Sequence, residues 1–260
     1  MDTMKVAVAG GTGVVGARTV DALRKAGHEA VVLSRSAGTD LLAAAHDTGE
    51  AHRLARALDG CAAVVDVTSV TTMGGAASTR FFEAVTTALL TAERAAGVKH
   101  HVALSIVGAA AAPYAYYAGK AAQERLVMAS GDGWSLLRAT QFHEFASQLA
   151  ARSRGRVKAV PAVRSQPVAA AEVGARLAEL ATGEPIGLSR DLGGPKVEDM
   201  PTLVRRYLAA TGSQARVFAV PLPGRWGRAL RDGTLLPGPD AQLGTTTFDD
   251  YLATVARRDS

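Results

Sequence analysis

The stretch from Val6 to Gly16 limits the folds open to this chain more than any other. Val6 and Val8 lie in a short apolar run, as expected for a strand buried on both faces of a parallel sheet. A glycine-rich turn follows at once. Apolar residues then recur at helical spacing as far as Gly27, where a C-terminal cap is expected. Strand, turn and helix make the first half of a βαβ unit.

The glycines of this turn are spaced to hold a phosphate group. Gly10, Gly13 and Gly16 form a G-x-x-G-x-x-G series. A tight turn needs a positive φ, and a backbone without Cβ lets a pyrophosphate come close. A glycine-rich loop without a ligand is the alternative, but the flanking strand and helix favour nucleotide binding. We therefore expect the nucleotide to lie on the whole turn, which consists of Gly10, Gly11, Thr12, Gly13, Val14, Val15 and Gly16.

The end of the expected second strand predicts the kind of dinucleotide. The run from His28 to Leu33 is followed by Ser34, Arg35 and Ser36. An acidic residue at this place would hold the ribose 2′-hydroxyl of NAD. A guanidinium and a hydroxyl suit a 2′-phosphate better, so NADP(H) is the expected cofactor and NAD(H) the second choice. Arg35 as an ordinary loop charge is the alternative.

Two further strand ends are expected at the same edge of the sheet. A short third strand is expected at Asp40-Leu41, where Asp40 is placed to meet the adenine. The fourth strand is expected over residues 62–68, and ligands bind at the carboxyl ends of such strands. Asp66 is either a cofactor ligand or a carboxylate satisfied within the strand end. The residues expected at the cofactor from this strand are Asp66, Val67 and Thr68.

A tyrosine and a lysine four residues apart open the helix that follows the expected fifth strand at 100–108. Tyr116 and Lys120 therefore share one helical face. An ammonium beside a phenol favours the phenolate and lowers the pKa of the tyrosine, which makes it a usable acid near neutral pH. Ser105, near the end of the strand, is placed to hydrogen-bond a substrate carbonyl. A role of the pair in holding the cofactor only is the alternative.

The adjacent histidines His100 and His101 are not expected to bind a metal. Neighbouring strand residues point to opposite faces of a sheet, and no HExxH or paired-cysteine pattern supplies further ligands. We expect no metal site in this chain.

The chain resembles an atypical member of the short-chain dehydrogenase/reductase superfamily, in the NmrA-like branch that includes bacterial quinone reductases. The resemblance covers nearly the whole length. It rests on Gly10-Gly11-Thr12-Gly13-Val14-Val15-Gly16, Leu33-Ser34-Arg35-Ser36, Ala103-Leu104-Ser105-Ile106-Val107-Gly108, Tyr116-Tyr117-Ala118-Gly119-Lys120, Leu137-Arg138-Ala139-Thr140-Gln141-Phe142-His143-Glu144-Phe145, Gln166-Pro167-Val168 and Pro221-Leu222-Pro223-Gly224.

This resemblance implies NAD(P) binding, and it implies either of two functions. Some members of the family reduce carbonyls or quinones, and others are redox-sensing regulators without evident catalysis. Carried over by position, Tyr116 would be the acid, Lys120 the partner of the ribose and of the tyrosine, and Ser105 the substrate anchor. The short interval between Ser105 and Tyr116 departs from the usual triad.

The C-terminal half is expected to supply the substrate side. The sixth strand, at residues 134–138, runs into a loop that lies beside the nicotinamide in such folds. His143 in this loop is either a general acid or a satisfied polar residue at a helix start. The residues expected to line the substrate pocket are Gln141, Phe142, His143, Met73 and Trp226.

The expected architecture is a Rossmann-type, doubly wound parallel sheet with a small interleaved C-terminal substrate lobe. Residues 1–152 are expected to form the NAD(P)-binding core. Residues 153–260 are expected to form a smaller substrate-side lobe that partly returns to the core.

Composition and charge exclude several other classes. The formal charge of +5 is spread along the chain with acids between the basic residues, which disfavours nucleic-acid binding. No apolar run approaches the ~20 residues of a membrane span. We expect no signal peptide, because the expected first strand begins within a few residues, and no internal disulfide, because Cys61 is the single cysteine. A cytoplasmic protein is expected.

The sequence therefore favours an NADPH-dependent oxidoreductase that delivers hydride to the carbonyl or quinone of a small, largely apolar substrate. A non-catalytic, NADP-binding redox sensor is the alternative. The expected partner is a small-molecule substrate, and the sequence leaves a homo-oligomer open.

Overall fold

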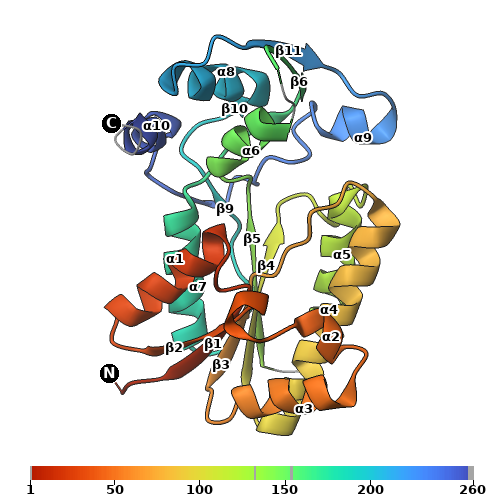
Figure 1. The fold of residues 1–260 in the computed structure, drawn as a ribbon, viewed down its shortest axis with the longest axis vertical. Helices are drawn as coiled ribbons and strands as arrows, with labels where there is room; N and C mark the ends of the chain where they lie inside the picture. Colours follow the sequence, from red (N-terminus) through yellow and green to blue (C-terminus); the bar gives the residue numbers. More distant parts are fainter. Residues whose placement is uncertain (1, 132, 153–154, 257–260) are drawn as a thin grey trace. The chain divides into compact units, whose positions relative to one another are not determined.

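The computed structural model describes residues 2–131, 133–152 and 155–256 of the 260-residue chain. The chain divides into two compact units (Figure 1). The first unit comprises Met1–Arg138 and Ala171–Ser189, and the second comprises Ala139–Ala170 and Arg190–Ser260. In this division the chain leaves the first unit after Arg138, and Ala171–Ser189 return to it. The expected division at residue 152, with a partial return of the later residues to the core, stays a prediction.

A parallel sheet forms the centre of the first unit. The order of its strands is β8-β5-β4-β3-β1-β2. The pairings β1–β2, β1–β3, β3–β4 and β5–β8 are parallel, so the expected Rossmann-type α/β fold is confirmed. The strands are β1 (Lys5–Ala9), β2 (Glu29–Leu33), β3 (Ala63–Asp66), β4 (His100–Ile106), β5 (Trp134–Ala139) and β8 (Gly187–Leu188).

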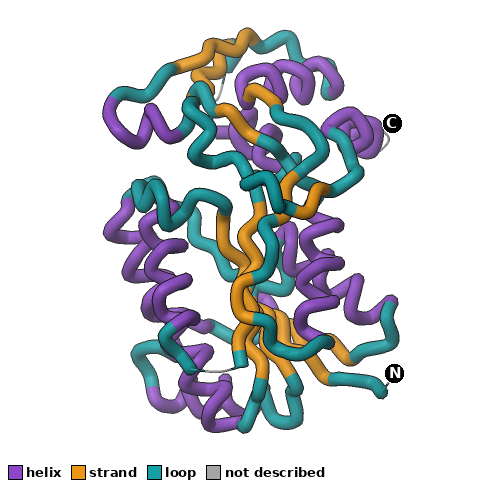
Figure 2. The backbone as a smooth tube through the Cα atoms, turned by 180° about the vertical axis from the view of Figure 1, so that it is seen from behind, coloured by secondary structure: helices purple, strands orange, loops and turns teal. Residues whose placement is uncertain are grey.

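Helices cover both faces of this sheet (Figures 1 and 2). On one face α7 packs so closely on α1 that a Cβ at Gly174 would lie 2.7 Å from the Arg18 backbone. This contact fixes the returning segment to the first unit. The helices are α1 (Val14–Lys25), α2 (Leu41–Ala44), α3 (Thr48–Ala57), α4 (Gly75–Ala96), α5 (Tyr116–Met128) and α7 (Ala170–Thr182), with a short 3-10 helix η1 (Arg35–Ala37).

The register of the central strands brings their carboxyl ends to one edge. Val6, Val8 and Ala9 of β1 are completely buried, as expected for a strand covered on both faces. Ala9 lies opposite Leu33 of β2 and Asp66 of β3. The three segments that follow these strands therefore leave the sheet at the same level.

The prediction of a third strand at Asp40-Leu41 is wrong. Residues from Leu41 onward form α2, and Asp40 is its N-cap. The Asp40 carboxylate accepts hydrogen bonds from the backbone N–H groups of Leu42 at 3.0 Å and Ala43 at 3.1 Å. An aspartate that satisfies the first N–H groups of a helix stabilises that helix over an extended strand.

Helices α4 and α5 pack against each other through a glycine. A Cβ at Gly119 would lie 2.2 Å from the Ser78 Oγ and 2.6 Å from the Phe82 ring. Ser78 Oγ also donates a hydrogen bond of 2.8 Å to the backbone carbonyl of Tyr116. This close packing sets the position of the helix that carries Tyr116 and Lys120.

The second unit has three small groups of paired strands. Strand β9 pairs in parallel with Ala139, the last residue of β5, and with β12, whereas β7 and β10 are antiparallel and β6 and β11 parallel. Its elements are α6 (Glu144–Arg152), β6 (Val157–Pro161), β7 (Arg164–Ser165), β9 (Leu192–Gly193), β10 (Glu198–Asp199), α8 (Met200–Ala210), β11 (Arg216–Val220), α9 (Gly224–Ala229), β12 (Gln242–Leu243) and α10 (Phe248–Ala256).

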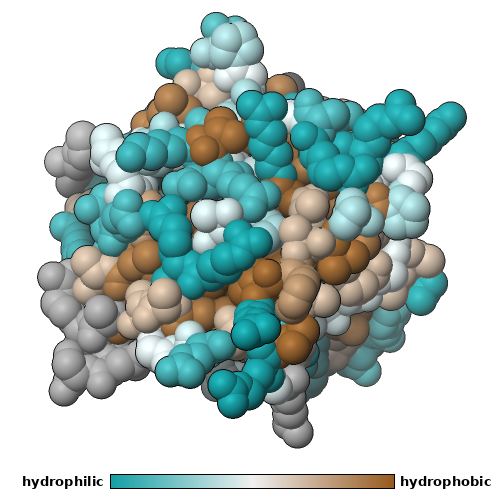
Figure 3. Space-filling view, turned by 90° about the horizontal axis from the view of Figure 1, so that it is seen from above, coloured by the Kyte–Doolittle hydropathy of each residue, from teal (hydrophilic) through white to brown (hydrophobic). Residues whose placement is uncertain are grey.

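Exposed apolar side chains are scattered over both units. Hydrophobic and hydrophilic residues are interspersed on the face shown in Figure 3. In the second unit, Val157 of β6 and Phe218 of β11 are more than half exposed. None of the helices formed by the described residues has the length and apolar character needed to cross a membrane.

Candidate active site

The glycine-rich turn closes tightly on itself between β1 and α1. Gly10 adopts a positive φ of 83°, and a Cβ there would lie 2.9 Å from the Val67 carbonyl oxygen. A Cβ at Gly16 would lie 2.2 Å from the Gly10 carbonyl oxygen. Both positions therefore require glycine. Gly13 has a φ of −76°, so the positive φ of the turn belongs to Gly10.

The turn leaves the start of α1 open. Gly13 is the N-cap and has no side chain to satisfy the first N–H groups, and the first turn of the helix holds no acidic residue. Thr12, Gly13 and Val14 are exposed. Unsatisfied N–H groups and the positive end of the helix dipole attract an anion. A phosphate group fits this cradle.

A free cation follows the end of β2. Ser34 caps η1 by accepting a 3.2 Å hydrogen bond from the Ala37 N–H, and its hydroxyl lies 3.1 Å from that of Ser36. Arg35 is exposed, and within the described part of the chain its guanidinium has no hydrogen-bond or ion-pair partner. A guanidinium in this state can bind a phosphate through two N–H groups.

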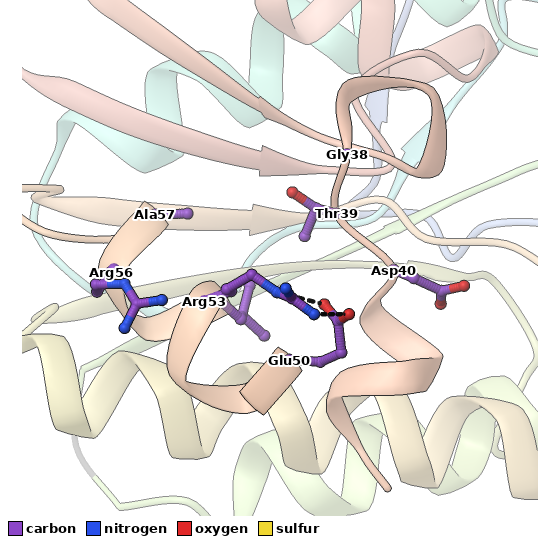
Figure 4. A pocket seen from close by; sticks show the side chains of 8 residues that line it. Gly38, Thr39, Asp40, Glu50, Arg53, Arg56 and Ala57 are labelled. Atoms are coloured by element: carbon purple, nitrogen blue, oxygen red, sulfur yellow. Dashed lines mark hydrogen bonds and ion pairs between the residues drawn. The ribbon is translucent and has the colours of Figure 1, made fainter. Parts of the chain in front are cut away.

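A cavity of about 350 Å³ lies among the segments that follow η1. Asp40 lines it, together with Glu50 and Arg53, which form an ion pair along α3 (Figure 4). The expected contact of Asp40 with the adenine stays a prediction. The lining residues are Gly38, Thr39, Asp40, Glu50, Arg53, Leu54, Arg56 and Ala57.

Asp66 is buried and fully engaged inside the first unit. One carboxylate oxygen accepts hydrogen bonds from the Thr68 N–H at 2.9 Å and the Thr68 hydroxyl at 2.6 Å. The other accepts a bond of 2.7 Å from the Gln123 side-chain amide. These contacts match the alternative of a carboxylate satisfied within the strand end. Val67, which lies between Asp66 and Thr68 in the sequence, donates its N–H to the Ala9 carbonyl oxygen at 3.0 Å.

Lys120 is buried beneath the same edge of the sheet. Its ammonium donates hydrogen bonds of 2.8 Å to the Leu104 carbonyl oxygen and 2.8 Å to Gln123 Oε1, and lies 4.3 Å from the centre of the Phe82 ring. Burial lowers its pKa to about 8, although Asp66 and Glu124 act in the opposite direction.

Tyr116 has a partner that the sequence pattern did not indicate. Its hydroxyl lies 3.0 Å from the Ser69 Oγ, in the exposed loop after β3. Burial raises the pKa of Tyr116 to about 12, against the lowering effect of the Ser69 hydrogen bond. Lys120 is not among the groups that shift this pKa, so the pKa of Tyr116 is raised and not lowered by the lysine as expected. Ala115, the N-cap before Tyr116, has an unusual φ of 50°.

Ser105 and Tyr116 are not hydrogen-bonded to each other in the part of the chain that the structure describes. Ser105 lies in β4 with 1% of its surface exposed, and its Oγ has no hydrogen-bond partner in the described part of the chain. A buried hydroxyl without a partner costs free energy, which such groups recover when a ligand binds. Its role as a substrate anchor stays a prediction.

The residues expected on the substrate side lie in different units. Met73 belongs to the loop before α4 in the first unit and is 63% exposed. The others belong to the second unit. They are Gln141, Phe142, His143 and Trp226.

His143 is buried inside the second unit. Its Nε2 lies 3.1 Å from the Thr246 carbonyl oxygen, and its ring stacks on Tyr251 at 5.7 Å between centres. This environment matches a satisfied polar residue at the start of α6 better than a free acid. Trp226 is half-buried in α9, and Gln141 Oε1 accepts a 2.7 Å hydrogen bond from Ser165.

The paired histidines of β4 have separate partners. His100 Nε2 lies 2.8 Å from Ser135 Oγ, and His101 Nδ1 lies 2.8 Å from Glu93 Oε1. Over the part of the chain that the structure describes, no group of three or more His, Cys, Asp or Glu side chains is placed to hold a metal ion.

Comparison with known proteins gives one family and many similar folds. A family model described as NAD(P)H-binding matches residues 10–182, more than half of the chain. A search of curated proteins found no match. Among solved structures, 633 chains match, and those given below are less than 25% identical to this chain, so they bear on the fold alone.

Three of these structures illustrate the range. An NADPH-dependent quinone oxidoreductase from Escherichia coli complexed with NADPH is 19% identical, with a TM-score of 0.68 over 96% of this chain and 99% of that one. A short-chain dehydrogenase/reductase superfamily protein from Agrobacterium tumefaciens with bound NAD is 21% identical, with a TM-score of 0.67 over 98% and 97%. A dTDP-glucose 4,6-dehydratase from Streptomyces venezuelae is 20% identical, with a TM-score of 0.70 over 98% and 96%.

Proposed function

Because this chain belongs to the NAD(P)H-binding family, we propose that it is an NADPH-dependent oxidoreductase acting on the carbonyl or quinone of a small, largely apolar substrate. One observation carries the proposal. The N-terminus of α1 is open, and the glycine turn before it has no room for a Cβ at Gly10 or Gly16. The strand before this turn pairs with β2, and Arg35, which follows β2, has no partner among the described residues. Phosphate cradle and guanidinium together suit a dinucleotide that carries a 2′-phosphate.

The binding roles follow from these two features. The N–H groups at the start of α1 hold the pyrophosphate, and Arg35, with Ser34 and Ser36 beside it, holds the 2′-phosphate. The expected contacts of Asp40, Val67 and Thr68 with the cofactor belong to the same proposal. NADPH is preferred over NADH because no carboxylate occupies the place of Arg35.

Tyr116 is the proposed proton donor. When bound, the cofactor supplies the hydride that reduces the substrate carbon. With a pKa of about 12, the Tyr116 phenol stays protonated at neutral pH and can give its proton to the developing alkoxide oxygen. Ser69, which is exposed and hydrogen-bonded to that phenol, gives the site a route for a replacement proton from water.

The test of this proposal is substrate-dependent loss of NADPH absorbance. The purified protein is mixed with NADPH and a panel of quinones and ketones, and each rate is compared with the rate without protein. Protein-dependent oxidation with at least one substrate class supports the oxidoreductase. Tight NADPH binding without turnover of any member contradicts it.

A non-catalytic NADP-binding sensor is the second candidate, and a specific observation favours it. The Tyr116 hydroxyl is bonded to Ser69, whereas the Lys120 ammonium is bonded to Leu104 and Gln123. Among the described residues, the tyrosine and the lysine therefore have different hydrogen-bond partners and are not bonded to each other. Tight binding of NADPH with no turnover is the outcome expected of a sensor.

A further inference from the structure

A chain of three buried side chains joins β3 to the helix of the candidate site. Asp66 accepts a 2.7 Å hydrogen bond from Gln123 Nε2, and Gln123 Oε1 accepts a 2.8 Å bond from the Lys120 ammonium. Asp66 and Gln123 are completely buried, and Lys120 is 4% exposed. Water does not compete for these bonds, so each strongly constrains its partners.

The chemistry of the two ends fixes the orientation of the amide in the middle. An ionised carboxylate only accepts hydrogen bonds, and an ammonium only donates them. Gln123 must therefore turn its NH2 group to Asp66 and its oxygen to Lys120. The Thr68 N–H and hydroxyl hold the other carboxylate oxygen of Asp66, which anchors the chain at the end of β3.

The arrangement leaves Lys120 with capacity for one more bond. An ammonium has three N–H groups, and among the described residues only the Leu104 carbonyl and Gln123 accept hydrogen bonds from this one. The Phe82 ring of α4 lies against the same group. The charged side chains whose fields act on Lys120 are Asp66 on β3 and Glu124 on α5, and Glu124 is itself bound by Arg138.

We propose that Asp66 and Gln123 are positioning residues that keep the Lys120 ammonium charged and aimed so that its remaining N–H can bind a hydroxyl of the cofactor. This inference rests on the proposed function for the identity of the ligand. The carboxylate fixes the amide, the amide fixes the ammonium, and neither Asp66 nor Gln123 needs to touch the cofactor. Burial alone lowers the pKa of Lys120, and the Asp66 charge counteracts that effect.

Two substitutions test the chain of bonds. Gln123→Leu removes the amide at nearly the same size. Asp66→Asn keeps the shape but replaces an acceptor-only group with an amide, so Gln123 is free to turn over and present its NH2 to Lys120. Each is expected to lower the pKa of Lys120 by about one unit, because a charge or acceptor that favours the ammonium is lost. Arg125→Gln, at an exposed position of α5, is the matched control and should leave the pKa unchanged.

The pKa is measured by NMR on protein with isotope-labelled lysine side chains, without cofactor. The chain has only six lysines, Lys5, Lys25, Lys99, Lys120, Lys158 and Lys196, and Lys120→Met assigns the relevant signal. A merely structural role of Gln123 would lower the melting temperature and leave this pKa where it is. If Gln123→Leu does not fold, Asp66→Asn carries the test alone.

NADPH affinity is the second readout. Both variants are expected to bind NADPH about 10-fold more weakly at neutral pH, the effect of losing a charged hydrogen bond. Unchanged Lys120 pKa and unchanged affinity in folded variants would overturn the inference while leaving the proposed function intact. If the wild-type protein does not bind NADPH, the proposed function fails, and the pKa comparison still decides whether Asp66 and Gln123 control Lys120.

Discussion

The Tyr116 hydroxyl lies 3.0 Å from the Ser69 Oγ, whereas the buried Ser105 Oγ has no hydrogen-bond partner among the described residues. The serine beside the proposed acid therefore comes from the loop after β3, and the serine of β4 is left with unused bonding capacity. Ser69 is exposed, so the pair connects a largely buried phenol with solvent. This geometry assigns different tasks to the two serines.

Single substitutions of the two serines are expected to separate these tasks. Ser69→Ala removes the partner of the phenol and should lower kcat for a ketone substrate with little change in KM, because proton supply is affected and binding is not. Ser105→Ala should raise KM if this hydroxyl binds the substrate carbonyl. Steady-state kinetics at saturating NADPH measures both. Equal effects of the two variants on kcat and KM would contradict the assignment.

Removal of the Tyr116 hydroxyl tests whether the protein uses a proton donor. Tyr116→Phe should leave NADPH affinity nearly intact and lower ketone turnover by roughly 10²–10⁴-fold, the contribution of a positioned acid. A quinone substrate should lose much less, because its reduced form can take protons from solvent. Turnover of a ketone by Tyr116→Phe at the wild-type rate would remove Tyr116 from the mechanism.

Cofactor preference should depend on Arg35. Arg35→Ala is expected to weaken NADPH binding by about 1.5–3 kcal/mol, the range for a hydrogen bond to a charged group, and to change NADH binding little. Arg24→Ala, which removes an exposed arginine at the end of α1, is the matched control. Calorimetric titration with each nucleotide gives the comparison. A wild-type protein that prefers NADH would show that Arg35 does not bind the 2′-phosphate.

The sequence predicted best where one local pattern decides the structure. The valines of β1 and the glycines of the turn allow few alternatives, and the strand, turn and helix are confirmed. Asp40 misled the prediction because its side chain caps α2, so the residues that follow it form a helix and not the expected third strand. A short polar residue before an apolar run is compatible with both structures.

Partners that are distant in the sequence could not be read from it. Ser69 and Tyr116 are 47 positions apart, and Asp66 and Gln123 are 57 apart. No spacing rule links residues at the end of a strand with residues of a helix three elements later. The orientation of Lys120 depends on Leu104 and Gln123, so the pattern Tyr116–Lys120 correctly placed both residues on α5 but not their hydrogen bonds.

The stability of the protein should depend on pH through Lys120. Burial lowers the pKa of this lysine from 10.5 to about 8. Between these two pH values Lys120 keeps its proton in the unfolded chain but has released it in the folded protein. The contribution of Lys120 to the free energy of unfolding therefore rises with pH. The Lys120→Met variant lacks this contribution, because methionine does not titrate. Urea unfolding from pH 8 to 10.5 should therefore show the wild-type protein gaining stability relative to Lys120→Met, and a constant or falling difference would contradict the lowered pKa.

Two glycines, Gly10 in the glycine turn and Gly27 just after α1, form a matched pair for the last test. Gly10 and Gly27 have nearly the same φ, 83° and 84°, but only Gly10 has atoms in the space of a Cβ, with the Val67 carbonyl oxygen at 2.9 Å. Gly27→Ala should cost about 1–2 kcal/mol of unfolding free energy from backbone strain alone. Gly10→Ala should cost more, because the backbone after β3 must move as well, and should also weaken NADPH binding. Denaturant unfolding and NADPH titration of both variants measure the two effects. Equal losses of stability, with NADPH affinity unchanged in both, would show that the close approach of the turn to β3 is not what the cofactor site requires.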